Sequence, residues 1–475
     1  MLEIKKGPFE PNLESLGEFE CPEWFRNAKF GIWSHWGPQS VPMFGDWYAR
    51  NMYIEGSDQY RYHCRVYGHP SEFGYKDILK LWKAEKFDPA ELMDLFVEAG
   101  AKYFVGQAMH HDNFDNYDSS HPYNSVKMGP GMDICAMWKK EAARHNLPFG
   151  LSEHQGASYT WFAYNKQCDQ TGAYAGIPYD GNDKNFETLY RDNDSEICDN
   201  ANLKPWYTEN EKYHLDWFRR MKDVVDKLQP DLLYSDGALP FGRYGEHIVA
   251  HLYNTSAALN GGKNNAVYNQ KSTDPSFSKI GVLDIERGVT DRLFEYPWQD
   301  DTSIGDWFYN VKDVYKTPCE IVDTLVDIVA KNGNLLMNVP QRPDGTIDFE
   351  CRNILKKVGG WMKDNADGIY DTRPYKKMGE GTTALTGGMF NEGAAQWTAA
   401  DFRFTTKGNS IYAFLMRAES EKTQIKSLGR LYENEIKAVS VYGKPVNFIQ
   451  KDGFLVVDLP ENRHPGCPMC IEVKV

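Results

Sequence analysis

The chain lacks the features of membrane-spanning and of nucleic-acid-binding proteins. No apolar run approaches the ~18 residues that a membrane span needs. Residues 1–20 contain no apolar signal-peptide core, which favours a cytoplasmic protein, or a periplasmic or secreted one if a signal was removed. With 53 basic against 67 acidic side chains, the formal charge is −14. Nucleic acids and anionic membranes are therefore not expected partners.

Several sequence motifs are also missing. The nine cysteines are an odd, dispersed set, which argues against a disulfide scaffold. Cys467 and Cys470 form a C-x-x-C near His464, but no second such pair completes a zinc site. The chain has neither a glycine-rich phosphate loop near its start nor a serine nucleophile elbow. These absences disfavour a dinucleotide-binding fold and a serine hydrolase, and no cofactor is indicated.

What the chain does have is a repeating pattern of short apolar strands and amphipathic helices over about residues 25–370. One helix is clear in FDPAELMDLFVEAG, where Asp88 can cap the start and Gly100 can end the helix. About eight such units favour an α/β fold of the (β/α)8 TIM-barrel type. Short alternating runs then predict a C-terminal β-sandwich. We expect a barrel domain over residues 1–370 and the sandwich over 371–475.

Polar side chains gather at the predicted carboxyl ends of the strands, where a barrel holds its active site. Carboxylates and histidines dominate this set, which comprises His35, Asp46, His110, His111, Asp112, Glu153, His154, Asp236, Lys271, Asp284 and Glu286. Aromatic residues make up 14% of the chain, and aromatic faces stack well on sugar rings, although a large barrel core also uses many of them.

Three functions fit these residues. Paired carboxylates with Trp and His at a barrel mouth are typical of glycoside hydrolysis. The same His and Asp residues can instead hold a divalent metal for hydrolysis. The metal hypothesis is the weaker one, because adjacent residues such as His110 and His111 point to opposite sides of a strand. A barrel that binds a sugar without cleaving it is the third possibility.

Each candidate also has an ordinary structural interpretation. Asp236 can simply cap a helix or form a turn before Gly237. Glu286 can pair with the neighbouring Arg287, and His35 can be a core histidine with satisfied hydrogen bonds. Their convergence at one rim of the barrel makes all three interpretations weaker together.

Long motifs in matching order carry a family resemblance. WFRNAKFGIWSHWGPQSVPMFGDWYARNMY, AKYFVGQAMHHDNF, DLLYSDG, PWQDDTSIGDWFYN and KNGNLLMNVPQRPDGTI together resemble glycoside hydrolase family 29, the retaining α-L-fucosidases. The resemblance covers about residues 20–375. It implies a catalytic barrel, a C-terminal β-sandwich, no metal, and a double-displacement mechanism that releases terminal L-fucose from oligo- or polysaccharides.

The resemblance assigns roles to particular residues. Asp236 matches the second Asp of the family's D-x-L-W-x-D-G motif and would be the nucleophile. The acid/base is not fixed by a motif, because Gln299 stands where some members have Glu and a Gln cannot transfer the proton. We choose Glu286 for this role, with Glu295 second and Glu153 third. The expected substrate-binding residues are His35, Asp46, Trp47, His110, His111, Glu153, His154, Lys271 and Trp298.

Departures from the family pattern bear on the substrate. The family's G-E-W-Y contains Asp46 here, and its Asn-Asp-Arg run ends in Lys271. More polar residues around the sugar can admit a C6 hydroxyl, so an α-L-galactosidase is the alternative, with L-galactose-containing glycans of the algal type as substrates. The expected partner is a carbohydrate with a terminal α-L-fucosyl or α-L-galactosyl residue, and a homo-oligomer stays open.

Overall fold

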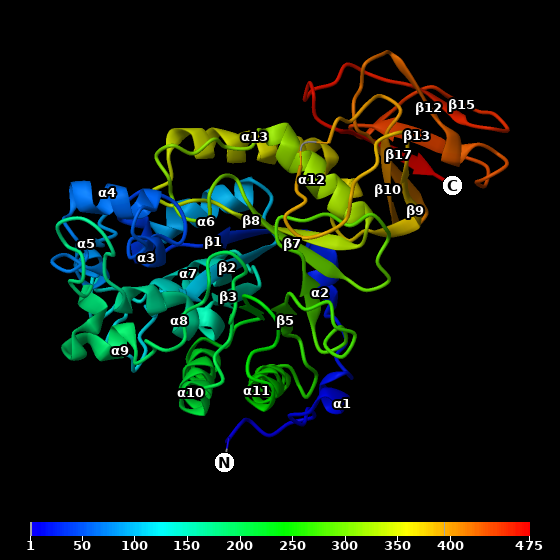
Figure 1. Cartoon of the computed structure of the whole chain (residues 1–475). Helices are drawn as coiled ribbons and strands as arrows, with labels where there is room; N and C mark the ends of the chain where they lie inside the picture. The colour runs from blue at the N-terminus through cyan, green and yellow to red at the C-terminus, as the bar shows by residue number, and fades with distance from the viewer. Residues whose placement is uncertain (1, 394) are drawn as a thin grey trace.

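Eight parallel strands of the N-terminal part close into a barrel in the order β1 to β8. Figure 1 shows barrel strands at the centre of this part with helices around them. The computed structural model describes residues 2–393 and 395–475. This architecture confirms the predicted (β/α)8-like fold. The barrel strands are β1 (Phe30–Ser34), β2 (Tyr103–Met109), β3 (Phe149–Glu153), β4 (Leu232–Ser235), β5 (Val267–Gln270), β6 (Val282–Asp284), β7 (Trp298–Ser303) and β8 (Gly333–Asn338).

Helices cover the outside of the barrel, but unevenly. The described residues between β5 and β7 contain no helix, so this part departs from a regular (β/α)8 repeat and leaves loops at the rim. None of the helices described is long and apolar enough to cross a membrane. The helices are α1 (Leu13–Leu16), α2 (Glu23–Ala28), α3 (Tyr48–Asn51), α4 (Asp58–Val66), α5 (Tyr75–Leu81), α6 (Pro89–Glu98), α7 (Ile134–Arg144), α8 (Gln155–Trp161), α9 (Glu187–Tyr190), α10 (Glu211–Leu228), α11 (Arg243–Leu259), α12 (Pro318–Ala330) and α13 (Phe349–Asn365).

The clearest predicted helix forms as expected. In α6 the Asp88 carboxylate accepts hydrogen bonds from the Ala90 and Glu91 amides, both at 3.1 Å. This satisfies two amides that have no partner within the helix. Gly100 follows the helix with φ +108°, a left-handed conformation that glycine adopts without steric cost.

Strand β7 is the barrel strand that the sequence pattern does not reveal, because polar residues fill its centre. Inside the barrel the Tyr103 hydroxyl donates to Gln299 at 2.9 Å, and the Gln299 amide donates to Asp284 at 2.8 Å. The Tyr234 hydroxyl donates to Asp301 at 3.0 Å. These bonds pair the Gln299 side chain and one carboxylate oxygen of Asp301, so polar residues can occupy the centre of this strand without apolar alternation.

The C-terminal part folds into two antiparallel sheets, one of six strands and one of three, which lie beside α12 and α13 in Figure 1. The expected domain boundary at residues 370 and 371 falls between α13 and β9. The strands are β9 (Arg373–Glu380), β10 (Phe402–Lys407), β11 (Ser410–Leu415), β12 (Lys422–Ile425), β13 (Ala438–Val441), β14 (Lys444–Pro445), β15 (Phe448–Gln450), β16 (Leu455–Asp458) and β17 (Met469–Lys474).

A disulfide that the cysteine pattern does not predict joins the two parts. Cys319, in the first turn of α12, is bonded to Cys467, just before β17. Cys467 is therefore not free to form a metal site with Cys470. One bridge across 148 residues is not a disulfide scaffold, so the barrel core still carries the fold.

Candidate active site

A cavity of about 740 Å³ opens at the carboxyl ends of the barrel strands. It is lined by residues that follow β1, β2, β3, β4, β5 and β6, and by residues from β7 and the loop after it. Most of the residues expected at the site lie here, namely His35, Asp46, Trp47, His110, His111, His154, Asp236, Lys271 and Glu286.

Asp236 follows β4 directly and faces this cavity. Its amide donates to the Glu153 carbonyl at 3.1 Å, which continues the β3–β4 pairing by one residue and holds the carboxylate at the strand end. Gly237 comes next with φ +121°, and a Cβ there would collide with the Tyr207 hydroxyl. The turn after Asp236 therefore requires glycine, both for its backbone and for its packing.

Three donors surround the Asp236 carboxylate. Lys271 Nζ lies 2.7 Å from one oxygen, and His111 Nε2 and His154 Nδ1 lie 3.2 and 3.4 Å from the other. Burial by itself would raise the pKa of Asp236, but the Lys271 charge and the two histidines outweigh it and hold the pKa well below its usual value. Asp236 is therefore ionised over the whole physiological pH range, as a nucleophile must be.

Glu286 shares the same lysine but has the opposite electrostatic character. Burial raises the pKa of Glu286 to about 7, the Lys271 charge opposes this, and Asp301 and Asp236 add to it. Lys271 Nζ is 2.5 Å from Glu286. Because both carboxylates contact the same nitrogen, the two oxygens that contact it can be no farther apart than the ~5–5.5 Å that separates the carboxyl groups of retaining glycosidases. Neighbouring carboxyl groups with pKa values this different suit one nucleophile and one proton donor.

Three histidines of the cavity wall, His35, His110 and His154, are held toward the neutral form. Burial and the neighbouring histidines lower the pKa of His35 and of His110 well below the usual value. Burial also lowers the pKa of His154 to about 4. His35 Nδ1 and His154 Nε2 are buried and have no protein partner among the described residues. Unpaired ring nitrogens at a cavity wall are suited to exchange hydrogen bonds with ligand hydroxyl groups.

The same nitrogens also fall within the reach of a metal ion. Two overlapping sets, His35 with His110 and His154, and His111 with His154 and Asp236, each place their ligand atoms within 4.8 Å of one another. Imidazole and carboxylate groups are ordinary ligands of divalent transition metals. Hydroxyl binding and metal binding are therefore both chemically compatible with this wall, and they differ in their response to chelation.

Adjacent His110 and His111 both reach the cavity, against the alternation expected of a strand. Strand β2 ends at Met109, and its register with β3 shifts between Gln107 and Met109. The two histidines therefore lie past the regular strand, where alternation no longer applies.

Aromatic residues and Asp46 form the outer wall of the cavity. Trp47 stacks on Trp206, with ring centroids 6.3 Å apart, and has a left-handed φ of +57°. Non-glycine residues in this conformation cluster at functional sites. Burial and the nearby Asp306 raise the pKa of Asp46 well above its usual value, which favours the protonated carboxyl group, a form that can donate a hydrogen bond.

Three expected residues lie outside the cavity. Glu153 points away from the barrel interior, and its carboxylate accepts from the Trp217 indole at 3.2 Å, because it precedes the inward-facing His154 by one strand position. Trp298 begins β7 at the opposite end of the barrel, where its indole donates to the Lys331 carbonyl at 3.0 Å. Glu295 is exposed in the loop before β7, at that same far end. Binding or proton transfer at the cavity by these three residues is not compatible with these positions.

The sequence reasoning also missed several lining residues. Asp301 and Tyr234 come from barrel strands, and Trp307 follows β7, so a correct assignment of β7 would have pointed to Asp301 and Trp307. Leu203 and Trp206 come from the polar loop between α9 and α10. Met389 and Phe390 come from the C-terminal part, and no sequence signal connects them to the barrel mouth.

Comparison with known proteins gives one consistent family. The family model described as alpha-L-fucosidase matches residues 2–367. The plasma alpha-L-fucosidase of Rattus norvegicus is 28% identical over 481 residues, covering 95% of this chain and 90% of the relative. The tissue alpha-L-fucosidase of Homo sapiens is 27% identical over 468 residues, covering 95% and 88%.

Solved structures agree with these sequence matches. The Thermotoga maritima alpha-fucosidase in complex with fucose is 25% identical, with a TM-score of 0.75 and coverage of 98% of this chain and 100% of that one. An alpha-L-fucosidase isoenzyme from Paenibacillus thiaminolyticus, 20% identical with a TM-score of 0.65, covers 95% and 98% and supports the fold alone. With a model match across most of its length, this chain belongs to the alpha-L-fucosidase family, a family of glycoside hydrolases.

Proposed function

We propose that the chain is a retaining, exo-acting α-L-fucosidase in which Asp236 is the nucleophile and Glu286 the acid/base. The observation that carries the proposal is the pair of carboxylates on one ammonium group, with Lys271 Nζ 2.7 Å from Asp236 and 2.5 Å from Glu286. A single cavity at the carboxyl ends of the barrel strands holds both groups.

The reaction runs in two displacements. The Asp236 carboxylate attacks the anomeric carbon of the terminal sugar, while the Glu286 proton passes to the glycosidic oxygen and the bond to the leaving group breaks. The product is a glycosyl ester on Asp236. Glu286, now ionised, takes a proton from water, the water oxygen attacks the anomeric carbon, and the ester bond breaks to restore Asp236. Two inversions give net retention of the α configuration.

Lys271 serves both carboxylates in this cycle. Its charge keeps Asp236 ionised before the attack and stabilises Glu286 after the proton has left. The surrounding carboxylates raise the pKa of Lys271 well above its usual value, although burial opposes them, so the lysine stays charged throughout. The neutral histidines are then free to bind the sugar hydroxyls.

Which sugar the enzyme releases, L-fucose or L-galactose, is a separate part of the proposal. Fucose is supported by the family and by the wall of Trp33, Trp206 and Trp307, against which a methyl group can pack. An L-galactosyl substrate is the alternative, because Asp46, whose pKa is raised, has a buried oxygen without a partner among the described residues and can hydrogen bond one additional hydroxyl. Rejection of one extra hydroxyl by an apolar pocket is worth only about a hundredfold.

An assay of an aryl α-L-fucoside beside the matching aryl α-L-galactoside tests the proposal. We expect release of L-fucose with a higher kcat/KM than release of L-galactose, the α anomer as the first product by NMR, and no loss of rate with a chelator. If the enzyme hydrolysed neither glycoside, sugar binding without cleavage would be the function that remains. Loss of activity on chelation, with recovery on adding a divalent metal, would overturn the two-carboxylate mechanism.

A further inference from the structure

A loop of the C-terminal part reaches the mouth of the catalytic cavity. It lies between β9 and β10, and we call residues 385–393 the mouth loop. Met389 and Phe390 of this loop line the cavity that contains Asp236 and Glu286. The C-terminal part therefore contributes directly to the site.

The mouth loop is fixed to the chain segment that carries the acid/base. Gly388 pairs with Val289 as an antiparallel bridge, with a 2.9 Å hydrogen bond from the Gly388 amide to the Val289 carbonyl. The Phe390 amide donates to the Glu286 carbonyl at 2.9 Å, and the Glu392 amide donates to the Arg287 carbonyl at 2.8 Å. Phe390 is therefore an immediate neighbour of Glu286.

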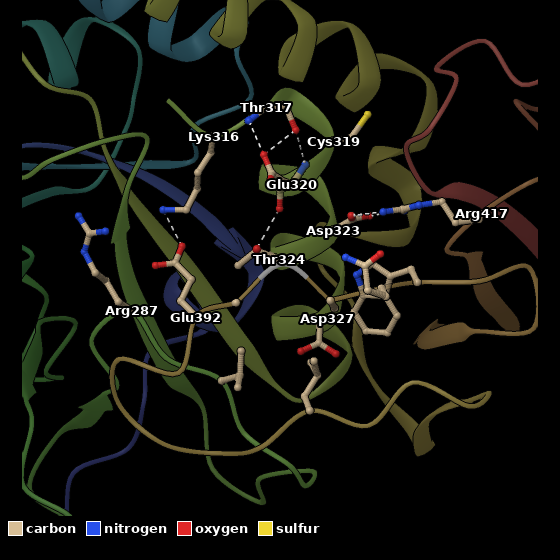
Figure 2. A pocket seen from close by; sticks show the side chains of 16 residues that line it. Arg287, Lys316, Thr317, Cys319, Glu320, Asp323, Thr324, Asp327, Glu392 and Arg417 are labelled. Carbon is tan, nitrogen blue, oxygen red and sulfur yellow. Dashed lines mark hydrogen bonds and ion pairs between the residues drawn. The ribbon is translucent and has the colours of Figure 1, made fainter. Parts of the chain in front are cut away.

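The side chain of Glu392 anchors the other face of the mouth loop, as Figure 2 shows. Its carboxylate lies 2.6 Å from Lys316 Nζ, the pair drawn in Figure 2. It also accepts from the Thr302 hydroxyl at 2.8 Å. A second cavity of about 480 Å³ lies on this face. Its charged groups are largely paired with one another, for example Asp323 with Arg417 at 2.6 Å. Through Lys316 and Thr302, Glu392 ties the mouth loop to the segment before α12 and to β7.

Phe390 is unusual in two ways for a residue of a fixed loop. It is 67% exposed, whereas large aromatic side chains are usually buried. Its φ of +55° lies in the left-handed region, which is disfavoured for bulky residues and marks functional positions. Leu203, which lines the same cavity, is also apolar and 38% exposed, so two loops contribute partly exposed apolar side chains to this cavity.

We propose that Phe390 is a specificity-determining residue that forms the platform for the leaving-group sugar. The inference rests on the proposed function. Glu286 must reach the glycosidic oxygen, and the other carbon on that oxygen belongs to the leaving group. The leaving sugar therefore lies beside Glu286, where Phe390 offers an exposed ring to its apolar face. The substrate class is a glycan in which the α-L-fucosyl unit is joined to a pyranose ring.

The test compares two substrates that need the same proton from Glu286. Methyl α-L-fucoside and an α-L-fucosyl hexose disaccharide both release an alcohol, but only the disaccharide has a ring to stack on Phe390. Phe390→Gly removes the ring and also relieves the left-handed strain, so the loop backbone is retained. Phe390→Ala is the second variant. Tyr432→Ala is the control, because Tyr432 is a 56% exposed aromatic residue of the C-terminal part outside the cavity lining.

We expect both Phe390 variants to lose roughly threefold to tenfold in kcat/KM on the disaccharide, as one aromatic stacking contact predicts. Methyl α-L-fucoside should be cleaved at the wild-type rate, and the thermal midpoint of Phe390→Gly should not fall. Equal losses on both substrates would show that Phe390 acts on the catalytic groups, and no loss on either would show that it binds nothing; each result overturns the inference. A wild-type enzyme that released no fucose from either substrate would instead overturn the proposed function.

Discussion

Replacement of Lys271 by methionine tests the electrostatic design of the site. Methionine is unbranched and of similar length, but it removes the only charge that contacts both Asp236, at 2.7 Å, and Glu286, at 2.5 Å, in the described site. An opposite charge at this range shifts the pKa of a carboxyl group by about 1–3 units. Each unit corresponds to about 1.4 kcal/mol of interaction with the ionised form.

The shift has a definite sign for each carboxyl group. The Lys271 charge lowers the pKa of both, so its removal raises both. Glu286, with a pKa of about 7, must be protonated to act as the acid, so the wild-type rate falls as the pH rises above about 7. In Lys271→Met this basic limb should move to higher pH by about 1–3 units. Asp236 and Glu286 then compete more evenly for one proton. Less of the enzyme has an ionised Asp236 beside a protonated Glu286, so kcat should fall at least ~10-fold.

The measurement is the pH dependence of kcat/KM on an aryl α-L-fucoside, with Lys271→Arg as the matched control. Arginine keeps the charge, so its basic limb should stay within about half a unit of the wild-type value. A basic limb that stays in place in Lys271→Met, or moves to lower pH, would refute the role of Lys271 as the shared partner of the two carboxylates.

Three further substitutions separate the remaining assignments. Glu286→Ala should lower kcat on a poor leaving group by about 10²–10⁴-fold, and azide should restore the rate on an activated aryl fucoside; absence of rescue would remove Glu286 from the acid/base role. Glu295→Gln should keep kcat/KM within about twofold of the wild type, because Glu295 is exposed at the far end of the barrel, and a large loss would reverse this choice. Trp298→Ala should lower the free energy of unfolding by about 3–5 kcal/mol in urea titrations, as expected for a buried tryptophan, without changing the KM of the folded fraction; a raised KM would place Trp298 at the substrate.

The sequence predicts most of the barrel because seven of its strands are apolar enough to stand out from the segments that flank them. The position of Asp236 and Glu286 at one cavity is predictable for a topological reason, since the carboxyl ends of parallel strands meet at one rim. Strand β7 escapes prediction because its buried Gln299 and Asp301 accept hydrogen bonds from Tyr103 and Tyr234, which lie far away in the sequence. The alternation of apolar and polar residues along one strand carries no information about hydrogen-bond partners that are distant in the sequence.

The errors at the site have a common cause. Glu153 and Trp298 are residues of the right type, and only the face of β3 and the end of β7 on which they lie exclude them from the cavity. Side-chain direction depends on strand register, which the sequence does not fix to one residue. Phe390 is the reverse case, a residue that lines the cavity without having been expected there. It belongs to the C-terminal part and reaches the barrel mouth only through tertiary packing.

Covalent trapping of the nucleophile is the most direct measurement of the central claim. The enzyme is incubated with a 2-fluoro-substituted α-L-fucosyl fluoride, digested and sequenced by mass spectrometry, with Asp236→Gly as the control. One fucosyl adduct on the peptide containing Asp236, absent from the control, is the predicted result. An adduct on another residue, or an enzyme that hydrolyses the probe to the β anomer without any adduct, would contradict the assignment of Asp236 and the retaining mechanism with it.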